Sequence, residues 1–149
     1  MSKLLLSIVL ICLCTSIINA QEKKPFDLEI YFNRKLTDQD RVKIKENIYQ
    51  YSQQIKSQPN NAGLFVNRGV QYAFLGLYPD AISDYNKAIK LDSTIAEAYY
   101  NRGIVQSRFA YTKRSCIDIK KSFLLGLSQA KTLYNNKCGL YKSELGECP

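Results

Sequence analysis

The tripeptide Asn-Arg-Gly occurs twice in this chain, first at residues 67–69 and again at residues 101–103. Each copy is preceded, after one spacer residue, by an aromatic side chain, Phe65 or Tyr99. We call the offset from position 67 to position 101 the repeat length. The same offset relates matching residues on both sides of the tripeptide, and no insertion is needed. Self-similarity at such a period is typical of a helical solenoid, in which each unit is a helix–turn–helix that cannot bury its apolar side alone.

Apolar periodicity and turn signals divide the repeat into paired helices. Thr37 and Asp40 form a capping-box pattern at the start of the first helix. Pro79 fits the first turn of a later helix, where its missing N–H is not needed. The helices that we predict cover residues 38–57, 62–76, 79–91, 96–109, 112–125 and 128–137.

The repeat extends in part beyond its two complete units. A step of one repeat length back from Tyr85 reaches Tyr51, so the first helix matches the second half of a preceding unit. The same step forward from Ala96 reaches Ala130, so the last helix matches the first half of a following unit. We therefore predict an all-α fold, a helical solenoid of two helix hairpins with an extra flanking helix at each end. The predicted divisions are a signal peptide (1–20), a poorly ordered leader (21–36), an N-terminal capping helix (37–61), two repeat units (62–95 and 96–127), and a C-terminal capping helix with a tail (128–149).

Glycine recurs in the middle of the first helix of each unit, at Gly69 and Gly103. Glycine at such a position costs roughly 1 kcal/mol relative to alanine. Because this cost recurs at the same place, we expect close approach of the paired helix to offset it. We expect the small side chains of Ala81 and Ser115 to lie opposite.

The first twenty residues have the pattern of a secretory signal peptide. An apolar run covers residues 4–18, and the sequence becomes abruptly polar after Ala20. We predict cleavage between Ala20 and Gln21, with an uncleaved membrane anchor as the alternative. The apolar run is shorter than the roughly 20 residues that span a bilayer, and no second run of spanning length follows. The mature chain is therefore expected to be exported, periplasmic or secreted, and not membrane-spanning.

The segment AGLFVNRGVQYAFLGLYPDAISDYNKAIKLD, which begins at Ala62, resembles the tetratricopeptide repeat family. Its aromatic residue, glycine, two alanines and tyrosine fall where that family has its signature. The second unit departs from the pattern, because Ser115 and Ser122 replace alanines and Ile119 replaces the aromatic residue. With the leader, the chain is similar to exported bacterial-type members of the family. The resemblance implies protein or peptide binding and nothing narrower.

In that family the first helix of each unit lines a concave inner face. The resemblance therefore implies a partner-binding groove formed by Val66, Asn67, Val70, Phe74, Tyr100, Asn101, Ile104 and Arg108. The asparagines would fix the backbone of an extended peptide, and the apolar residues would contact its side chains. A related subfamily grips the C-terminal carboxylate of chaperones with lysines and asparagines. Here the lysine-bearing positions carry Gly63, Val66 and Glu97, so the sequence does not support that clamp.

The arginine of the tripeptide has a regular acidic companion. The spacing from Arg68 to Asp84 equals the spacing from Arg102 to Asp118. In an antiparallel pair of helices this spacing brings the two side chains to one level, which predicts a structural ion pair with bidentate geometry. Recognition of an external anion by the arginines, or solvated side chains without a role, are the alternatives.

Three cysteines follow the predicted cleavage site: Cys116, Cys138 and Cys148. Export makes oxidation plausible, and the odd number leaves one cysteine unpaired within the chain. A Cys116–Cys138 bridge would join the C-terminal helix to the second unit. A Cys138–Cys148 bridge and three free thiols are the alternatives. The chain has no Cys-x-x-Cys motif, which disfavours thioredoxin-like redox chemistry.

Composition disfavours catalysis and cofactor binding. The chain has no histidine, and so it lacks the commonest general base and metal ligand. No phosphate-binding loop or nucleophile elbow occurs, so we expect no enzyme activity, metal or cofactor. The formal net charge of +8 favours anionic partners, although an exported protein meets little nucleic acid and none is expected as a partner.

These features predict a non-catalytic exported adaptor that binds a segment of another protein through its concave face. The first alternative is a structural or assembly subunit that packs with copies of itself or with an envelope complex. The second is a basic protein that contacts an anionic surface.

Overall fold

The computed structural model describes residues 35–146, and every regular element in this range is a helix. The predicted signal peptide and most of the predicted leader lie outside the described residues. None of the helices between residues 35 and 146 combines the length and the apolar character needed to cross a membrane. The helices are α3 (Asp38–Ser57), α4 (Ala62–Phe74), α5 (Tyr78–Leu91), α6 (Ala96–Gln106), α7 (Lys113–Leu124), α8 (Gln129–Lys137), the 3-10 helix η1 (Gly139–Tyr141) and α9 (Lys142–Leu145).

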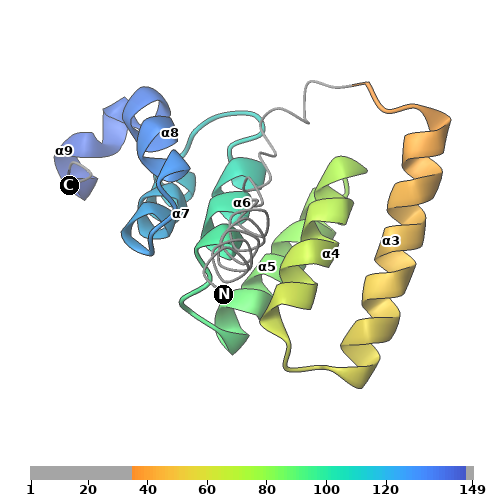
Figure 1. Cartoon of the computed structure of the whole chain (residues 1–149). Helices are drawn as coiled ribbons and strands as arrows, with labels where there is room; N and C mark the ends of the chain where they lie inside the picture. The colour runs from red at the N-terminus through yellow and green to blue at the C-terminus, as the bar shows by residue number, and fades with distance from the viewer. Residues whose placement is uncertain (1–34, 147–149) are drawn as a thin grey trace, which may run out of the picture.

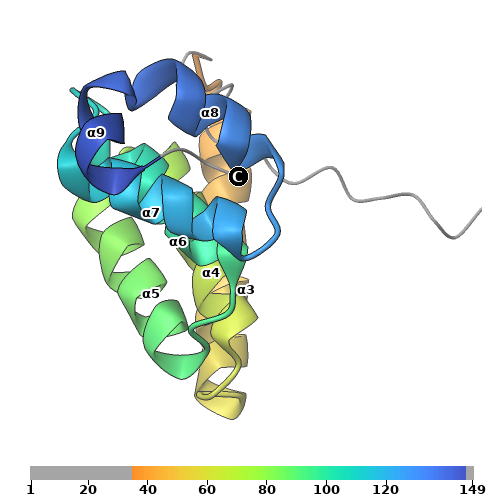
Figure 2. The ribbon, with the colours of Figure 1, turned by 90° about the vertical axis from the view of Figure 1, so that its left-hand side faces the viewer.

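The helices follow one another across the molecule in chain order, from α3 at one edge to α9 at the other (Figure 1). The closest pairings are the hairpins α4–α5 and α6–α7. The flanking helix α3 packs on α4, α5 packs on α6, and α8 packs on α7. The view turned by 90° shows the same succession of stacked helices (Figure 2). This arrangement confirms the predicted all-α solenoid of two hairpins with an extra helix at each end.

Two predicted helices end earlier than expected. Helix α4 ends at Phe74 because the chain reverses at Gly76, whose φ of 76° is in the left-handed region that favours glycine. Helix α6 ends at Gln106, and the Ser107 hydroxyl donates to the carbonyl oxygen of Ile104 at 2.9 Å. The predicted extension to Phe109 is wrong, because that side chain has no apolar surface to cover and is 95% exposed.

The two mid-helix glycines face large side chains. A Cβ atom on Gly69 would lie 2.7 Å from Cε1 of Tyr85, and one on Gly103 would lie 2.9 Å from Cγ1 of Ile119. The atoms nearest the Cβ position of Gly69 belong to the ring of Tyr85 and not to Ala81, the small residue that we expected to lie opposite. At Gly103 the second unit adds the backbone oxygen of Ser115, at 3.0 Å from the same Cβ position. Glycine is needed because the second helix presses a bulky side chain against the backbone of the first.

Small residues that recur between the hairpins are completely buried. Ala81 and Ala88 of α5 have no exposed surface, and neither do Ser115 and Ser122 at the matching positions of α7. The serine hydroxyls are satisfied within their own helix, since Ser122 donates to the carbonyl oxygen of Ile119 at 2.7 Å and Ser115 to that of Thr112 at 2.9 Å. Alanine and serine are thus interchangeable here, because the serines bring no unsatisfied polar group into the core.

A disulfide bond joins Cys116 of α7 to Cys138 at the end of α8, with 5.7 Å between the Cα atoms. Both residues are fully buried. Of the alternatives left open by the sequence, the structure therefore contains the bridge between the second unit and the C-terminal helix. Cys148 lies outside the described residues. Closure of a loop of this length contributes roughly 3 kcal/mol in the chain-entropy account.

Substitution of Gly69 by alanine tests the close approach of α5 to α4. The added methyl group would overlap the buried ring of Tyr85. Overpacking of this kind costs about 1–3 kcal/mol, more than the helix propensity gained. We expect Gly69→Ala to lower the urea midpoint of unfolding.

Gly63→Ala on the same helix is the matched control, because the nearest atom to its Cβ position is 3.4 Å away. We expect this variant to be as stable as the wild type or more stable. Equal midpoints for Gly69→Ala and the wild type would contradict the close approach.

Candidate functional site

The arginine of each Asn-Arg-Gly tripeptide forms a forked bond to an aspartate of the second helix. Arg68 donates from Nε to Oδ2 of Asp84 at 2.8 Å and from Nη2 to Oδ1 at 2.7 Å. Arg102 repeats the geometry with Asp118, at 2.7 Å and 2.8 Å. The two helices of each hairpin are thus joined by a bidentate ion pair, as the constant Arg–Asp spacing predicts.

The same guanidinium groups also reach the preceding helix. Nη1 of Arg68 donates to Oγ of Ser52 on α3 at 3.1 Å, and Nη1 of Arg102 donates to Oδ1 of Asn86 on α5 at 2.6 Å. Ser52 and Asn86 are themselves separated by one repeat length. Each arginine therefore connects three successive helices, and the connection has the period of the sequence repeat.

The bridging groups are mostly removed from solvent. About a fifth of each arginine side chain is exposed, compared with 7% of Asp84 and 6% of Asp118. The hydrogen bond to the aspartate raises the pKa of each arginine, and this effect outweighs the opposing effect of burial. Internal partners occupy three N–H directions of each guanidinium, so the arginines have a structural role without an external anion.

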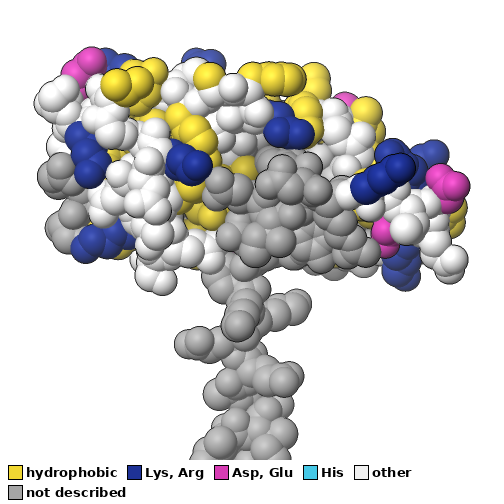
Figure 3. Space-filling model, turned by 90° about the horizontal axis from the view of Figure 1, so that it is seen from above, with side chains coloured by type: hydrophobic (Ala, Val, Ile, Leu, Met, Phe, Trp, Pro, Cys, Tyr) yellow, Lys and Arg dark blue, Asp and Glu magenta, His cyan; other side chains and the backbone are white. Residues whose placement is uncertain are grey.

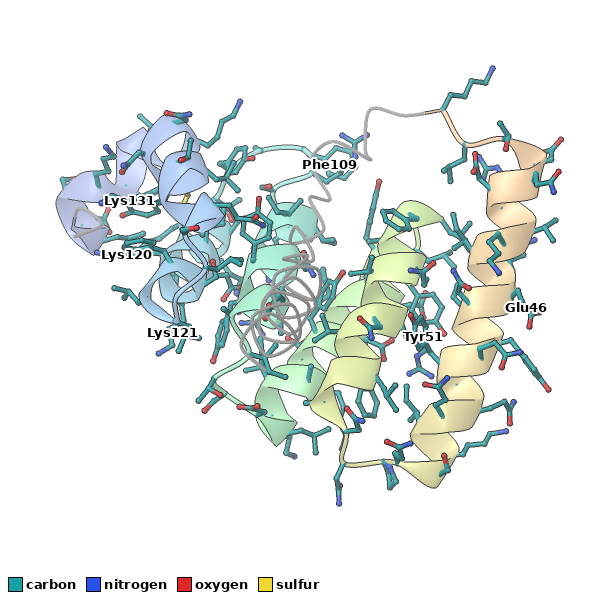
Figure 4. The ribbon with its side chains drawn as sticks, in the orientation of Figure 1. Glu46, Tyr51, Phe109, Lys120, Lys121 and Lys131 are labelled. Carbon is teal, nitrogen blue, oxygen red and sulfur yellow. A yellow bond between two sulfur atoms is a disulfide. The ribbon has the colours of Figure 1, made fainter. Side chains whose placement is uncertain are left out.

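The series of bridges stops at the C-terminal end. One repeat length beyond Arg102 stands Asn136, and the same step beyond Asn86 reaches Lys120. Lys120, labelled in Figure 4, donates instead to the carbonyl oxygens of Leu145 and Gly146 next to α9. The disulfide therefore joins the end of α8 to α7, and Lys120 joins α7 to the end of α9, in place of an arginine bridge.

Helices α4, α6 and α8 are the first helices of successive repeat units. On each of them an asparagine directly precedes the repeat position at which Arg68 and Arg102 form their bridges: Asn67, Asn101 and Asn135. Successive residues of a helix point about 100° apart. The asparagine therefore lies on a different side of the first helix from the side chain at the bridging position. Asn135 is a candidate that the sequence reasoning missed, although one repeat length from Asn101 leads directly to it.

The middle asparagine is buried and has an unpaired acceptor. Asn101 is only 4% exposed, and its Oδ1 has no hydrogen-bond partner among the described residues. Asn67 and Asn135, in contrast, are exposed. An acceptor without a partner inside a protein costs about 1–3 kcal/mol, which makes Asn101 a place where an incoming donor would be stabilised.

The predicted groove residues divide into buried and accessible sets. Phe74 is half-buried, and Asn67 and Arg108 are exposed. The remaining members are buried: Val66, Val70, Tyr100, Asn101 and Ile104. The apolar members of the buried set belong to the core that α4 and α6 share with the second helices. Arg108 is held by a hydrogen bond from Nε to the hydroxyl of Tyr78 at 3.1 Å.

Residues 35–146 contain no group of three or more histidine, cysteine, aspartate or glutamate side chains that could hold a metal ion. The stacked helix hairpins, with an asparagine at the matching position of each first helix, define a helical-repeat protein.

Comparison with known proteins finds a match for part of the repeat. Residues 71–108 match the family model of the TPR repeat. The match and the stacked helix hairpins together support a TPR repeat within the chain.

Curated relatives contain a similar segment within much longer chains. The protein is 34% identical over 88 residues to the Hsp70-Hsp90 organizing protein of Triticum aestivum. This alignment covers 52% of this chain and 15% of the relative. It is 35% identical over 81 residues to Hsp70-Hsp90 organizing protein 1 of Glycine max, which covers 48% of this chain and 14% of the relative. The similarity therefore concerns the repeat region and not the whole of these proteins.

Replacement of Arg102 by lysine tests the three-helix bridge. Lysine keeps the positive charge but cannot form the planar fork or reach Asp118 and Asn86 together. We expect the free energy of unfolding to fall by about 1.5–3 kcal/mol, the range for hydrogen bonds to charged groups. Urea denaturation measures the change.

Arg114→Lys is the control, because Arg114 lies on the exposed side of α7. We expect less than about 0.5 kcal/mol from this substitution. If both variants lost equally little stability, the bridge would have no measurable role.

Proposed function

We propose that the chain is a non-catalytic adaptor that holds an extended segment of another protein along the first helices α4, α6 and α8. The observation that carries this proposal is the unpaired Oδ1 of buried Asn101, placed in series with Asn67 and Asn135. A backbone N–H of the bound segment would supply the missing donor.

Amide side chains suit this task because each provides both a donor and an acceptor. An extended peptide presents one backbone N–H and one C=O group at each residue, with a rise of about 3.3 Å per residue. Recognition of the main chain in this way gives affinity with little dependence on side chains, while Phe74 would supply an apolar contact.

The relatives support a protein partner in general terms. They are named as organizing proteins of Hsp70 and Hsp90, and the shared segment is the helical repeat. The chaperone-type carboxylate clamp is not part of our proposal, because its lysine positions carry Gly63, Val66 and Glu97 here. We propose contacts to an uncharged main chain instead.

The N-terminal edge of the solenoid disfavours stacking of copies end to end. The positions of α3 that match the buried Ala81 and Ala88 of α5 carry Asn47 and Gln54. Glu46 lies on the outer side of α3, whereas Tyr51 lies between α3 and α4 (Figure 4). A helix with amides where the repeat requires small apolar residues is suited to cap the stack and not to extend it.

The C-terminal edge is closed by a different device. Lys137 of α8 stands at the position that Gly69 and Gly103 occupy in the complete units. Because even a Cβ atom would overlap the second helix in those units, a lysine excludes an equivalent partner helix. Both edges therefore favour the adaptor over a self-assembling subunit.

Contact with an anionic surface is also less favoured. Seen from above, basic side chains stand at several separate places on the described part of this face, among neutral and apolar ones (Figure 3). Charges distributed in this way raise solubility more readily than they form one docking surface.

We further propose that the adaptor acts outside the cytoplasm, as a periplasmic or secreted protein, after cleavage between Ala20 and Gln21. The apolar leader supports export, and the buried Cys116–Cys138 bridge suits an oxidising compartment. We do not extend the proposal to an envelope complex.

Analysis of the protein purified from its native cells tests export. We expect N-terminal sequencing to begin at Gln21 and Cys116 and Cys138 to resist thiol alkylation until a reductant is added. A protein that retains Met1 and is alkylated at both cysteines without reduction would contradict this part of the proposal.

Selection of peptides tests the adaptor function. We would select short peptides from a random display library on the immobilised protein and measure their affinity by calorimetry. Because each hydrogen bond contributes about 0.5–1.5 kcal/mol, we expect Asn101→Ala to weaken binding roughly twofold to tenfold. The Asn67→Ala/Asn135→Ala double variant removes two such bonds and should weaken binding roughly fivefold to a hundredfold.

Asn136→Ala is the matched control, since this exposed asparagine neighbours Asn135 on the same helix. It should leave the affinity unchanged. Peptides that bind all of these variants as tightly as the wild type would exclude the asparagine row as the binding site.

A further inference from the structure

A cleft of about 240 Å³ opens between the N-terminal half of α3 and the C-terminal end of α4. These helices are the two at the N-terminal edge in Figure 1. The cleft combines apolar side chains with amides, one acidic residue and one basic residue. Its walls are formed by Leu36, Asp40, Lys43, Ile44, Asn47, Gln71 and Phe74.

The next helix junction shows what the protein places in the corresponding position. A step of one repeat length takes Ile44 to Tyr78 and Phe74 to Arg108. Between α5 and α6, the ring of Tyr78 packs against the core and its hydroxyl accepts a hydrogen bond from Nε of Arg108 at 3.1 Å. The smaller Ile44 provides no such ring between α3 and α4, where the cleft is found.

The amides of the cleft are a second departure from the repeat. Nδ2 of Asn47 donates to Oε1 of Gln71 at 3.2 Å. The matching positions in the next junction are Ala81 and Val105, which are both buried. The first junction therefore presents polar groups at a place where the second is closed by apolar packing. The remaining N–H groups of Gln71 and the carbonyl oxygen of Asn47 are suited to a hydroxyl group.

We propose that this cleft is a binding site for an aromatic side chain with a hydroxyl group, a tyrosine of the segment held by the adaptor. The size is sufficient, because an apolar cavity of about 150 Å³ binds benzene. This proposal rests on the proposed function through Phe74, which belongs both to the predicted groove and to the cleft. A tyrosine anchored here would set the register of an otherwise backbone-directed interaction.

Titration with p-cresol, which has the side-chain structure of tyrosine, tests the cleft without a partner protein. We expect saturable NMR shifts of the Ile44 methyl groups and the Asn47 and Gln71 side-chain amides. Toluene lacks the hydroxyl and should bind roughly twofold to tenfold more weakly, the range for one neutral hydrogen bond. Absence of saturable shifts at these groups would overturn the proposal.

Two substitutions test the cleft further, because each replaces a residue of the cleft with the residue at the matching position of the next repeat. Ile44→Tyr should fill the cleft and lower p-cresol affinity at least tenfold. Val42→Tyr is the matched control, because Val42 is 68% exposed on the same helix and outside the cleft walls. Gln71→Val should remove the preference for p-cresol over toluene. This second variant tests the cleft even if Ile44→Tyr fails to fold. Unchanged affinity in Ile44→Tyr, or an unchanged preference in Gln71→Val, would refute the site.

The two proposals fail separately. Saturable p-cresol binding together with failure to select any peptide would support the cleft and contradict the adaptor function. Peptides that depend on the asparagine row, together with no p-cresol binding, would support the adaptor function and overturn the cleft.

Discussion

The forked bond between a guanidinium and a carboxylate inside each hairpin is the interaction on which the rest of the solenoid depends. It fixes the first and second helices at one level, while the third N–H direction of the same arginine reaches the preceding helix. One side chain thereby controls the geometry both within a unit and between units. The glycine at the next position lets the second helix approach closely enough for the fork to form.

The same interaction connects structure to the proposed function. Because the arginine holds the first helix in one rotation, it also fixes the direction of the asparagine at the position before it. The arginine bridges end where the repeat ends, and the Cys116–Cys138 bond then holds α8, which carries Asn135. The helices that carry the three asparagines are thus held in place by two kinds of bond, the ion pairs at α4 and α6 and the disulfide at α8.

Much of this fold could be predicted from the period of the sequence. The features that could not be predicted have physical causes. The repeat length and the constant Arg–Asp spacing predict the hairpins and their ion pairs, because both are properties of regular helices. The contact of Gly69 with Tyr85 was not predictable in this way, since it depends on the orientation of a ring. The burial of Ile104 and the cleft beside Ile44 depend on how neighbouring volumes fill space, which a single repeat pattern does not contain.

A double-mutant cycle between Asn86→Ala and Asp118→Asn tests the central claim most directly. The two residues lie on different helices and interact with the same guanidinium, that of Arg102. If this arginine joins three helices as one unit, the effects on unfolding free energy will be non-additive by at least about 0.5 kcal/mol. Effects that add within about 0.3 kcal/mol would show that the two contacts are independent and would contradict the account.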